Sequence, residues 1–99
     1  MTIYKTPYEQ FGVSIDFAAD IGAGNSVASI NAVSATNNLT GTNSTAEVIA
    51  SPPAPLITGT AVAFEVTGGA VGETHTLSVE IVSSIGEKYQ GDLTLRITA

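Results

Sequence analysis

The sequence contains no cysteine and no tryptophan. Without cysteine the chain has no disulfide framework, no thiolate metal site and no cysteine nucleophile. A domain of this size must therefore be stabilised by the packing of its core or by association with other chains.

Basic residues are also scarce. Lys5, Lys88 and Arg96 stand against nine acidic residues, and the formal net charge is −6. This charge would repel a phosphate backbone, so we expect no nucleic-acid partner. The three cations are scattered along the sequence and form no polybasic membrane patch.

Long apolar runs are missing as well. No window of about 18 apolar residues occurs, so we expect no membrane-spanning helix. The segment TIYKTPYEQF after Met1 lacks the apolar core and the small-residue cleavage site of a signal peptide. We therefore expect a soluble protein that is synthesised in the cytoplasm.

The residues that are present favour β-structure. The chain has 99 residues, of which 43% are hydrophobic and only 12% are charged, and it includes ten glycines. This composition is unlike that of a helical domain rich in Glu, Lys and Leu. We expect one all-β domain with many turns, which buries roughly 60 to 65% of its unfolded surface on folding.

The N-terminal half contains one clear strand. Residues 1–10 are polar with isolated aromatics and a proline, which predicts an extended arm or a first edge strand ahead of a single domain over residues 11–99. Residues 11–20 alternate, with Phe11, Val13, Ile15 and Phe17 on one face. This period of two predicts a half-buried strand.

The middle of the chain is harder to interpret. Residues 26–36 are compatible with a helix or a strand, and their Ser, Asn, Thr and β-branched residues favour the strand. Residues 36–45 predict a surface loop, and residues 45–50 predict a short strand. Prolines at positions 52, 53 and 55 predict a connection from one sheet to the other.

The C-terminal half alternates most clearly. The pattern predicts strands over residues 60–67, 74–84 and 89–98, with a bulge at Gly91. Six to seven short strands without a convincing helix predict an antiparallel two-sheet β-sandwich of immunoglobulin-like type. The antibody pattern of paired cysteines around a tryptophan is absent.

Candidate chemistry is weak. His75 continues the apolar stripe of its strand, which favours a structural role over a catalytic one. Asp16 and Asp20 allow a calcium site in principle, but solvated turn residues are the favoured interpretation. The glycine-rich residues 68–72 match no phosphate-binding motif. We expect no catalytic residue, cofactor or metal.

Surface contacts are the remaining option. Tyr4, Tyr8 and Phe11 are candidate anchors for a protein partner, although packing of the first strand would explain them equally well. The asparagine-rich loop around Asn38 is a second candidate surface. The glycosylation spacings at Asn38 and Asn43 are expected by chance in such a loop.

Two stretches carry a family resemblance. TGGAVGETHTLSVEIVSSIGEKYQGDLTLRITA, together with KTPYEQFGVSIDFAADI, resembles small tailed-bacteriophage and prophage structural proteins with an immunoglobulin-like or fibre-adaptor sandwich. The resemblance implies a virion component that is made in the bacterial host cytoplasm and assembled into the particle.

From this resemblance we expect a non-enzymatic head-decoration protein or a head–tail or fibre adaptor. Its partners would be other virion proteins, and self-association is possible in a symmetric particle. The alternative is a carbohydrate-binding or adhesive immunoglobulin-like module, for which the aromatic supply is poor.

Overall fold

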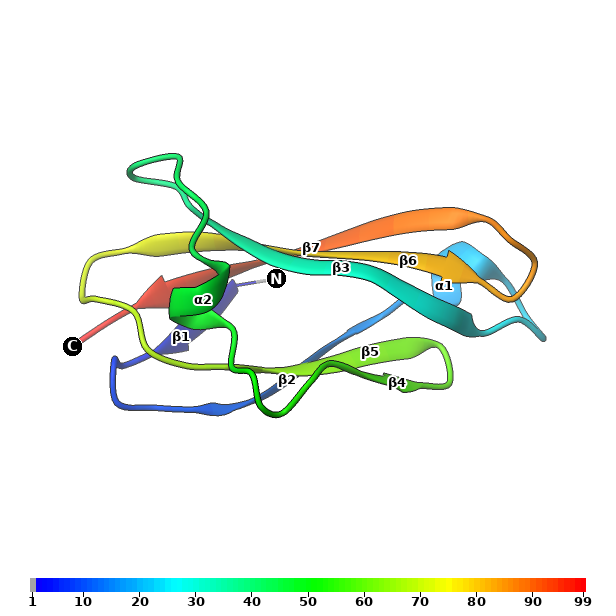
Figure 1. Cartoon of the computed structure of the whole chain (residues 1–99), viewed down its shortest axis with the longest axis horizontal. Helices are drawn as coiled ribbons and strands as arrows, with labels where there is room; N and C mark the ends of the chain where they lie inside the picture. Colours follow the sequence, from blue (N-terminus) through cyan, green and yellow to red (C-terminus); the bar gives the residue numbers. More distant parts are fainter. Residues whose placement is uncertain (1) are drawn as a thin grey trace.

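The computed structural model describes residues 2–99, which form two stacked β-sheets (Figure 1). The larger sheet has the strand order β1-β7-β6-β3, and the smaller one has the order β2-β5-β4. The strands are β1 (Thr2–Lys5), β2 (Phe11–Asp16), β3 (Val27–Asn37), β4 (Leu56–Thr58), β5 (Ala61–Val66), β6 (Thr74–Ser83) and β7 (Lys88–Ile97). The predicted all-β sandwich is confirmed.

The core lies between the sheets and follows from the alternation of the sequence. In β6 every second side chain from His75 to Ser83 is buried, and β5 buries Val62, Phe64 and Val66. The inward side chains of β2 are half-buried and pack against this core. Removing such apolar surface from water is the main stabilising contribution to the fold.

Strand β3 explains why residues 26–36 were difficult to interpret. Its pairing with β6 shifts register between Val27 and Ser29 and again between Ile30 and Ala32. Each irregularity changes which side chains face the core, so Val27, Ile30 and Val33 all pack inward although their spacing fits no single alternation. The predicted strand is therefore present, but no single alternation of inward and outward side chains runs along its whole length.

Strand β1 is the one strand that departs from antiparallel pairing. Residues 2–5 form an edge strand that runs parallel to β7, with Lys5 opposite Ile97. The chain then crosses to the smaller sheet, where β2 pairs with β5. Local alternation carries no information on this pairing, because the two partners lie at opposite ends of the chain.

The prediction of a short strand over residues 45–50 is wrong. Residues Thr45–Val48 form a single helical turn, α2, and Ile49 then makes an isolated bridge to Val66. Local hydrogen bonds explain the turn, since the side chain of Asn43 accepts from the amide of Thr45 at 2.9 Å. Such contacts compete with strand formation.

The first predicted strand is shorter than expected. It ends at Asp16, and Ala18–Ile21 form a second helical turn, α1. Among the residues described, neither helix is long and apolar enough to cross a membrane. The proline-rich residues 51–55 join α2 to β4, so the chain reaches the smaller sheet there as predicted.

The prediction of a bulge at Gly91 is also wrong. Gly91 pairs with Val79 in a continuous register between β6 and β7. A Cβ atom at this position would lie 2.9 Å from Cγ2 of Ile15 and 3.2 Å from the ring of Phe17. The glycine is therefore required by the close approach of the two sheets and not by a bulge.

Candidate functional site

Three loops and the C-terminus gather at one end of the sandwich, on the left in Figure 1. We call this the loop end and define it as residues 6–10, 38–43, 67–73 and 98–99. The strand register places them together, through the pairs Lys5–Ile97, Thr74–Arg96, Asn37–His75 and Phe11–Val66. Segments from across the whole sequence therefore share one end of the molecule.

The loop end carries exposed apolar side chains. Tyr8, Leu39 and Val71 each lie on a different one of its three loops, and they are 96%, 81% and 59% exposed. Tyr4, next to the end of β1, is also exposed. Large apolar side chains that gather in an exposed region are typical of interaction surfaces.

The structure separates the four contact residues proposed from the sequence. Tyr4 and Tyr8 project into solvent, whereas Phe11 is half-buried and packs against the core. Asn38 lies at the start of its loop, where its amide donates to the carbonyl of Thr74 at 2.8 Å. Its side-chain oxygen accepts from the hydroxyl of Thr76, so Asn38 supports the loop as well as facing solvent.

Sequence reasoning did not select Leu39 or Val71. Leu39 is the single large apolar residue in an otherwise polar loop, and Val71 interrupts a glycine-rich turn. Each is an isolated apolar residue at a position where turn chemistry requires none. That pattern could have drawn attention to them, but only the register shows that they share one end.

His75 lies just beneath this end and is completely buried. Its Nδ1 is 2.8 Å from the hydroxyl of Ser44, and its Nε2 is 3.1 Å from a carboxylate oxygen of Glu73. Both ring nitrogens therefore have partners within the protein. This arrangement satisfies the hydrogen-bonding groups of a buried polar ring.

Glu73 is the centre of this network. Its carboxylate accepts a hydrogen bond from the amide of Ala70 at 2.8 Å and another from the side chain of Asn37 at 3.0 Å. The bond from Ala70 and the contact with His75 hold the pKa of Glu73 below its ordinary value, although partial desolvation opposes them. The carboxylate is thus held in its charged form.

Glu47 completes a possible ligand set. It lies in α2, and one of its carboxylate oxygens is within 4.8 Å of ligand atoms of both Glu73 and His75. In the described part of the chain this is the one group of three or more potential metal-ligating side chains. The sequence did not indicate it, because Glu47 is distant from the other two along the chain.

Asp16 and Asp20 show a different arrangement. The hydroxyl of Thr60 and the amide of Ala18 both donate to Asp16, and these bonds hold its pKa below its ordinary value. Asp16 therefore stabilises the turn into α1. Across residues 2–99 neither aspartate belongs to a cluster of three ligating groups, so a calcium site there has no support.

Lys5, at the end of β1, is buried. Its ammonium donates to the carbonyl oxygens of Thr6 and Gly68. Burial lowers the pKa of Lys5, and the charge of Glu9 partly opposes this effect. The contact with Gly68 ties the edge strand β1 to the loop end.

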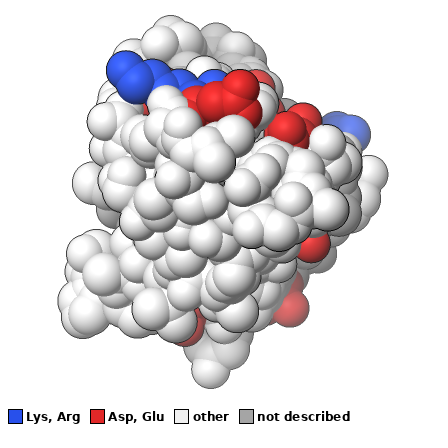
Figure 2. Space-filling model, turned by 90° about the vertical axis from the view of Figure 1, so that its right-hand side faces the viewer, with Lys and Arg blue, Asp and Glu red and all other residues white. Residues whose placement is uncertain are grey.

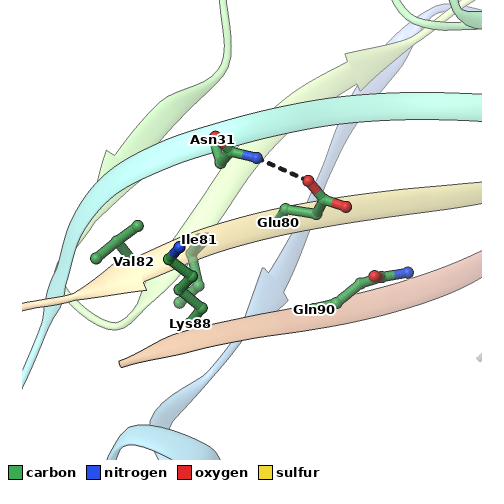
Figure 3. Close-up of a pocket in the computed structure, with 6 residues that line it drawn as sticks. All are labelled: Asn31, Glu80, Ile81, Val82, Lys88 and Gln90. Carbon is green, nitrogen blue, oxygen red and sulfur yellow. Dashed lines mark hydrogen bonds between the residues drawn. The ribbon is translucent and has the colours of Figure 1, made fainter. Parts of the chain in front are cut away.

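A polar depression of about 350 Å³ lies on the outer face of the larger sheet. Figure 3 shows its lining by Asn31, Glu80, Ile81, Val82, Lys88 and Gln90. The side chain of Asn31 donates to Glu80 at 2.8 Å across the depression. Its lining includes no aromatic ring on which a sugar could stack.

The opposite end of the sandwich carries its charges around its rim. Figure 2 faces this end and shows charged atoms along the upper and right-hand edges and at the lower edge, around an uncharged centre. The few basic atoms visible do not form a continuous stripe. This face therefore lacks the basic footprint that nucleic-acid binding requires.

Comparison with known proteins identifies the chain at family level. No curated protein matches it. A sequence model for the family described as podophage GP4 fiber-tail adaptor protein gp77 matches residues 5–96, which include all of the strands except the first residues of β1 and the last of β7. The chain therefore belongs to this family and is a phage structural protein of the fibre–tail adaptor type.

Proposed function

We propose that this chain is a non-enzymatic connector that joins the tail fibre to the tail and makes one of its contacts through the loop end. The family match supports the adaptor role. The observation that carries the assignment of the surface is the exposure of Tyr8, Leu39 and Val71 on three separate loops at this end.

The loop end has the features of a protein contact. Its apolar side chains are held on short loops that emerge from a rigid sandwich, so little flexibility is lost on binding. Aromatic anchors such as Tyr4 and Tyr8 are favoured at the centres of interfaces. Repetition around a symmetric tail would add many such contacts together.

The proposal also covers where the protein acts. We expect it to be synthesised in the host cytoplasm, to assemble with other virion proteins, and to bind neither nucleic acid nor membranes. Self-association would occur within the particle. A position as head decoration is the less favoured version, because the family is described as a fibre–tail adaptor.

Mass spectrometry of purified particles tests this proposal. Peptides of the chain should be present, and their ratio to the major capsid protein should match the few copies of a tail component. A ratio near one per capsid subunit would instead identify a head-decoration protein. Absence from intact particles would contradict a virion role and favour the adhesive module, which glycan binding by the isolated chain would then support.

A further inference from the structure

We propose that Glu47, Glu73 and His75 form a binding site for a divalent transition-metal ion such as Zn²⁺. One oxygen of each carboxylate and one ring nitrogen of His75 lie within 4.8 Å of one another. Imidazole nitrogen and carboxylate oxygen are ordinary zinc ligands, at about 2.0 to 2.2 Å from the ion. This inference does not depend on the adaptor function.

The charge of the cluster favours a cation. Two carboxylates converge here, and over residues 2–99 the one contact at ion-pair distance is that between His75 and Glu73. The nearby ammonium of Lys5 is directed to the carbonyls of Thr6 and Gly68. No lysine or arginine therefore neutralises the pair directly, and a bound divalent ion would do so.

The spacing suits a small ion. Donor atoms in a tetrahedral zinc site are about 3.3 to 3.4 Å apart, given ligand distances of about 2.0 to 2.1 Å. Nε2 of His75 already lies 3.1 Å from the oxygen of Glu73. Glu47 is exposed, so its side chain is free to rotate, and the proposal requires its carboxylate to move to the same distance.

Neighbouring groups are placed to orient the ligands. When Nε2 binds a metal, Nδ1 of His75 carries the proton and can donate it to the hydroxyl of Ser44 at 2.8 Å. Asn37 donates to the second oxygen of Glu73 at 3.0 Å. Supporting hydrogen bonds of this kind fix the ring and carboxylate orientations in known metal sites.

The backbone holds α2 against the segment that carries the other two ligands. The amide of Thr67 donates to the carbonyl of Val48 at 2.8 Å. A Cβ at Gly68 would lie only 2.6 Å from the carbonyl oxygen of Glu47, so glycine allows this close approach. The backbone of Glu47 is therefore held close to the segment that leads to Glu73 and His75.

Titration calorimetry with Zn²⁺ on the full chain, without a histidine tag, tests the proposal. We expect one ion per chain, and we expect Glu47→Gln to weaken binding by about tenfold or more. Glu80→Gln is the matched control, since it removes the same charge from an exposed glutamate at a different place. Absence of binding, or equal affinity of the two variants, would overturn the proposal.

The single histidine allows a direct readout in the unaltered protein. Because His75 is the only imidazole in the chain, its ring nitrogen resonances are unambiguous. One equivalent of Zn²⁺ should shift the Nε2 resonance strongly and fix the proton on Nδ1. Zinc binding that leaves both ring resonances unchanged would show that the ion lies elsewhere. This measurement requires no variant at the buried His75.

Discussion

The hydroxyl oxygen of Ser44 lies 2.8 Å from Nδ1 of His75, and both side chains are buried. Ser44 immediately precedes α2, whereas His75 lies near the start of β6. The contact therefore ties the chain after β3 to the start of β6, an inner strand of the larger sheet. Within residues 2–99 no buried side-chain nitrogen or oxygen lacks a hydrogen-bond partner, and this pair is one reason.

Replacing Ser44 with alanine should destabilise the protein. The substitution leaves Nδ1 of His75 without its partner in a buried position, which costs about 1 to 3 kcal/mol. Urea unfolding followed by circular dichroism measures the change in the free energy of unfolding. Ser14→Ala is the control, because Ser14 is exposed on β2 and should change stability by less than about 0.5 kcal/mol. Equal effects of the two substitutions would show that the hydrogen bond contributes nothing.

Stability should fall in acid because of Glu73. Its folded pKa lies below the ordinary value of 4.5, chiefly because Ala70 donates to the carboxylate. The unfolded chain therefore binds a proton more readily than the folded one. The stabilising contribution is complete above about pH 4.5 and is lost as the pH falls from there through the folded pKa.

Glu73→Gln should remove part of this acid dependence. Urea unfolding measured at several pH values below 4.5 should give a flatter profile for the variant than for the unaltered protein. Glu47 and His75 are the titratable groups that face Glu73, and the substitution leaves both of them in place. An identical slope in the two proteins would contradict the prediction.

Alanine at Gly91 should also be destabilising. The added Cβ would lie 2.9 Å from Ile15 and 3.2 Å from Phe17, which forces the two sheets apart at a cost of about 1 to 3 kcal/mol. Gly12→Ala provides the control, since a Cβ there would meet no atom within 4 Å. Thermal unfolding should show a lower midpoint for Gly91→Ala and no loss for Gly12→Ala. A loss in both would indicate that strand glycines matter for a reason other than space.

The sequence predicted the sandwich because alternation is a local property. In β2, β5, β6 and β7 the apolar residues recur at every second position, and each strand is buried on one face as that pattern requires. The pattern in β3 was ambiguous because two register irregularities change its phase. The turns α1 and α2 were missed because side chains such as Asp16 and Asn43 decide them locally.

The candidate site was less predictable because its parts come from distant segments. His75 was correctly placed in the apolar stripe of its strand, but its partners Ser44 and Glu73 become neighbours only through the fold. In the same way, the loops with Leu39 and Val71 meet at one end because of how β3, β6 and β7 pair. The parallel pairing of β1 with β7 is equally invisible in any local window.

Removing an exposed side chain at the loop end should impair assembly without affecting the fold. Tyr8 is 96% exposed, so Tyr8→Ala should change the free energy of unfolding by less than about 0.5 kcal/mol. If Tyr8 anchors the contact, the loss in binding should reach about 2 kcal/mol, or roughly thirtyfold in affinity. Ile85→Ala is the control, because Ile85 is 60% exposed in the turn at the opposite end.

Complementation of a phage that lacks the gene, with the variant quantified in purified particles, measures the effect. Reduced incorporation of Tyr8→Ala alone would support the loop end as a contact, whereas reduced incorporation of Ile85→Ala alone would move the contact to the opposite end, which faces the viewer in Figure 2.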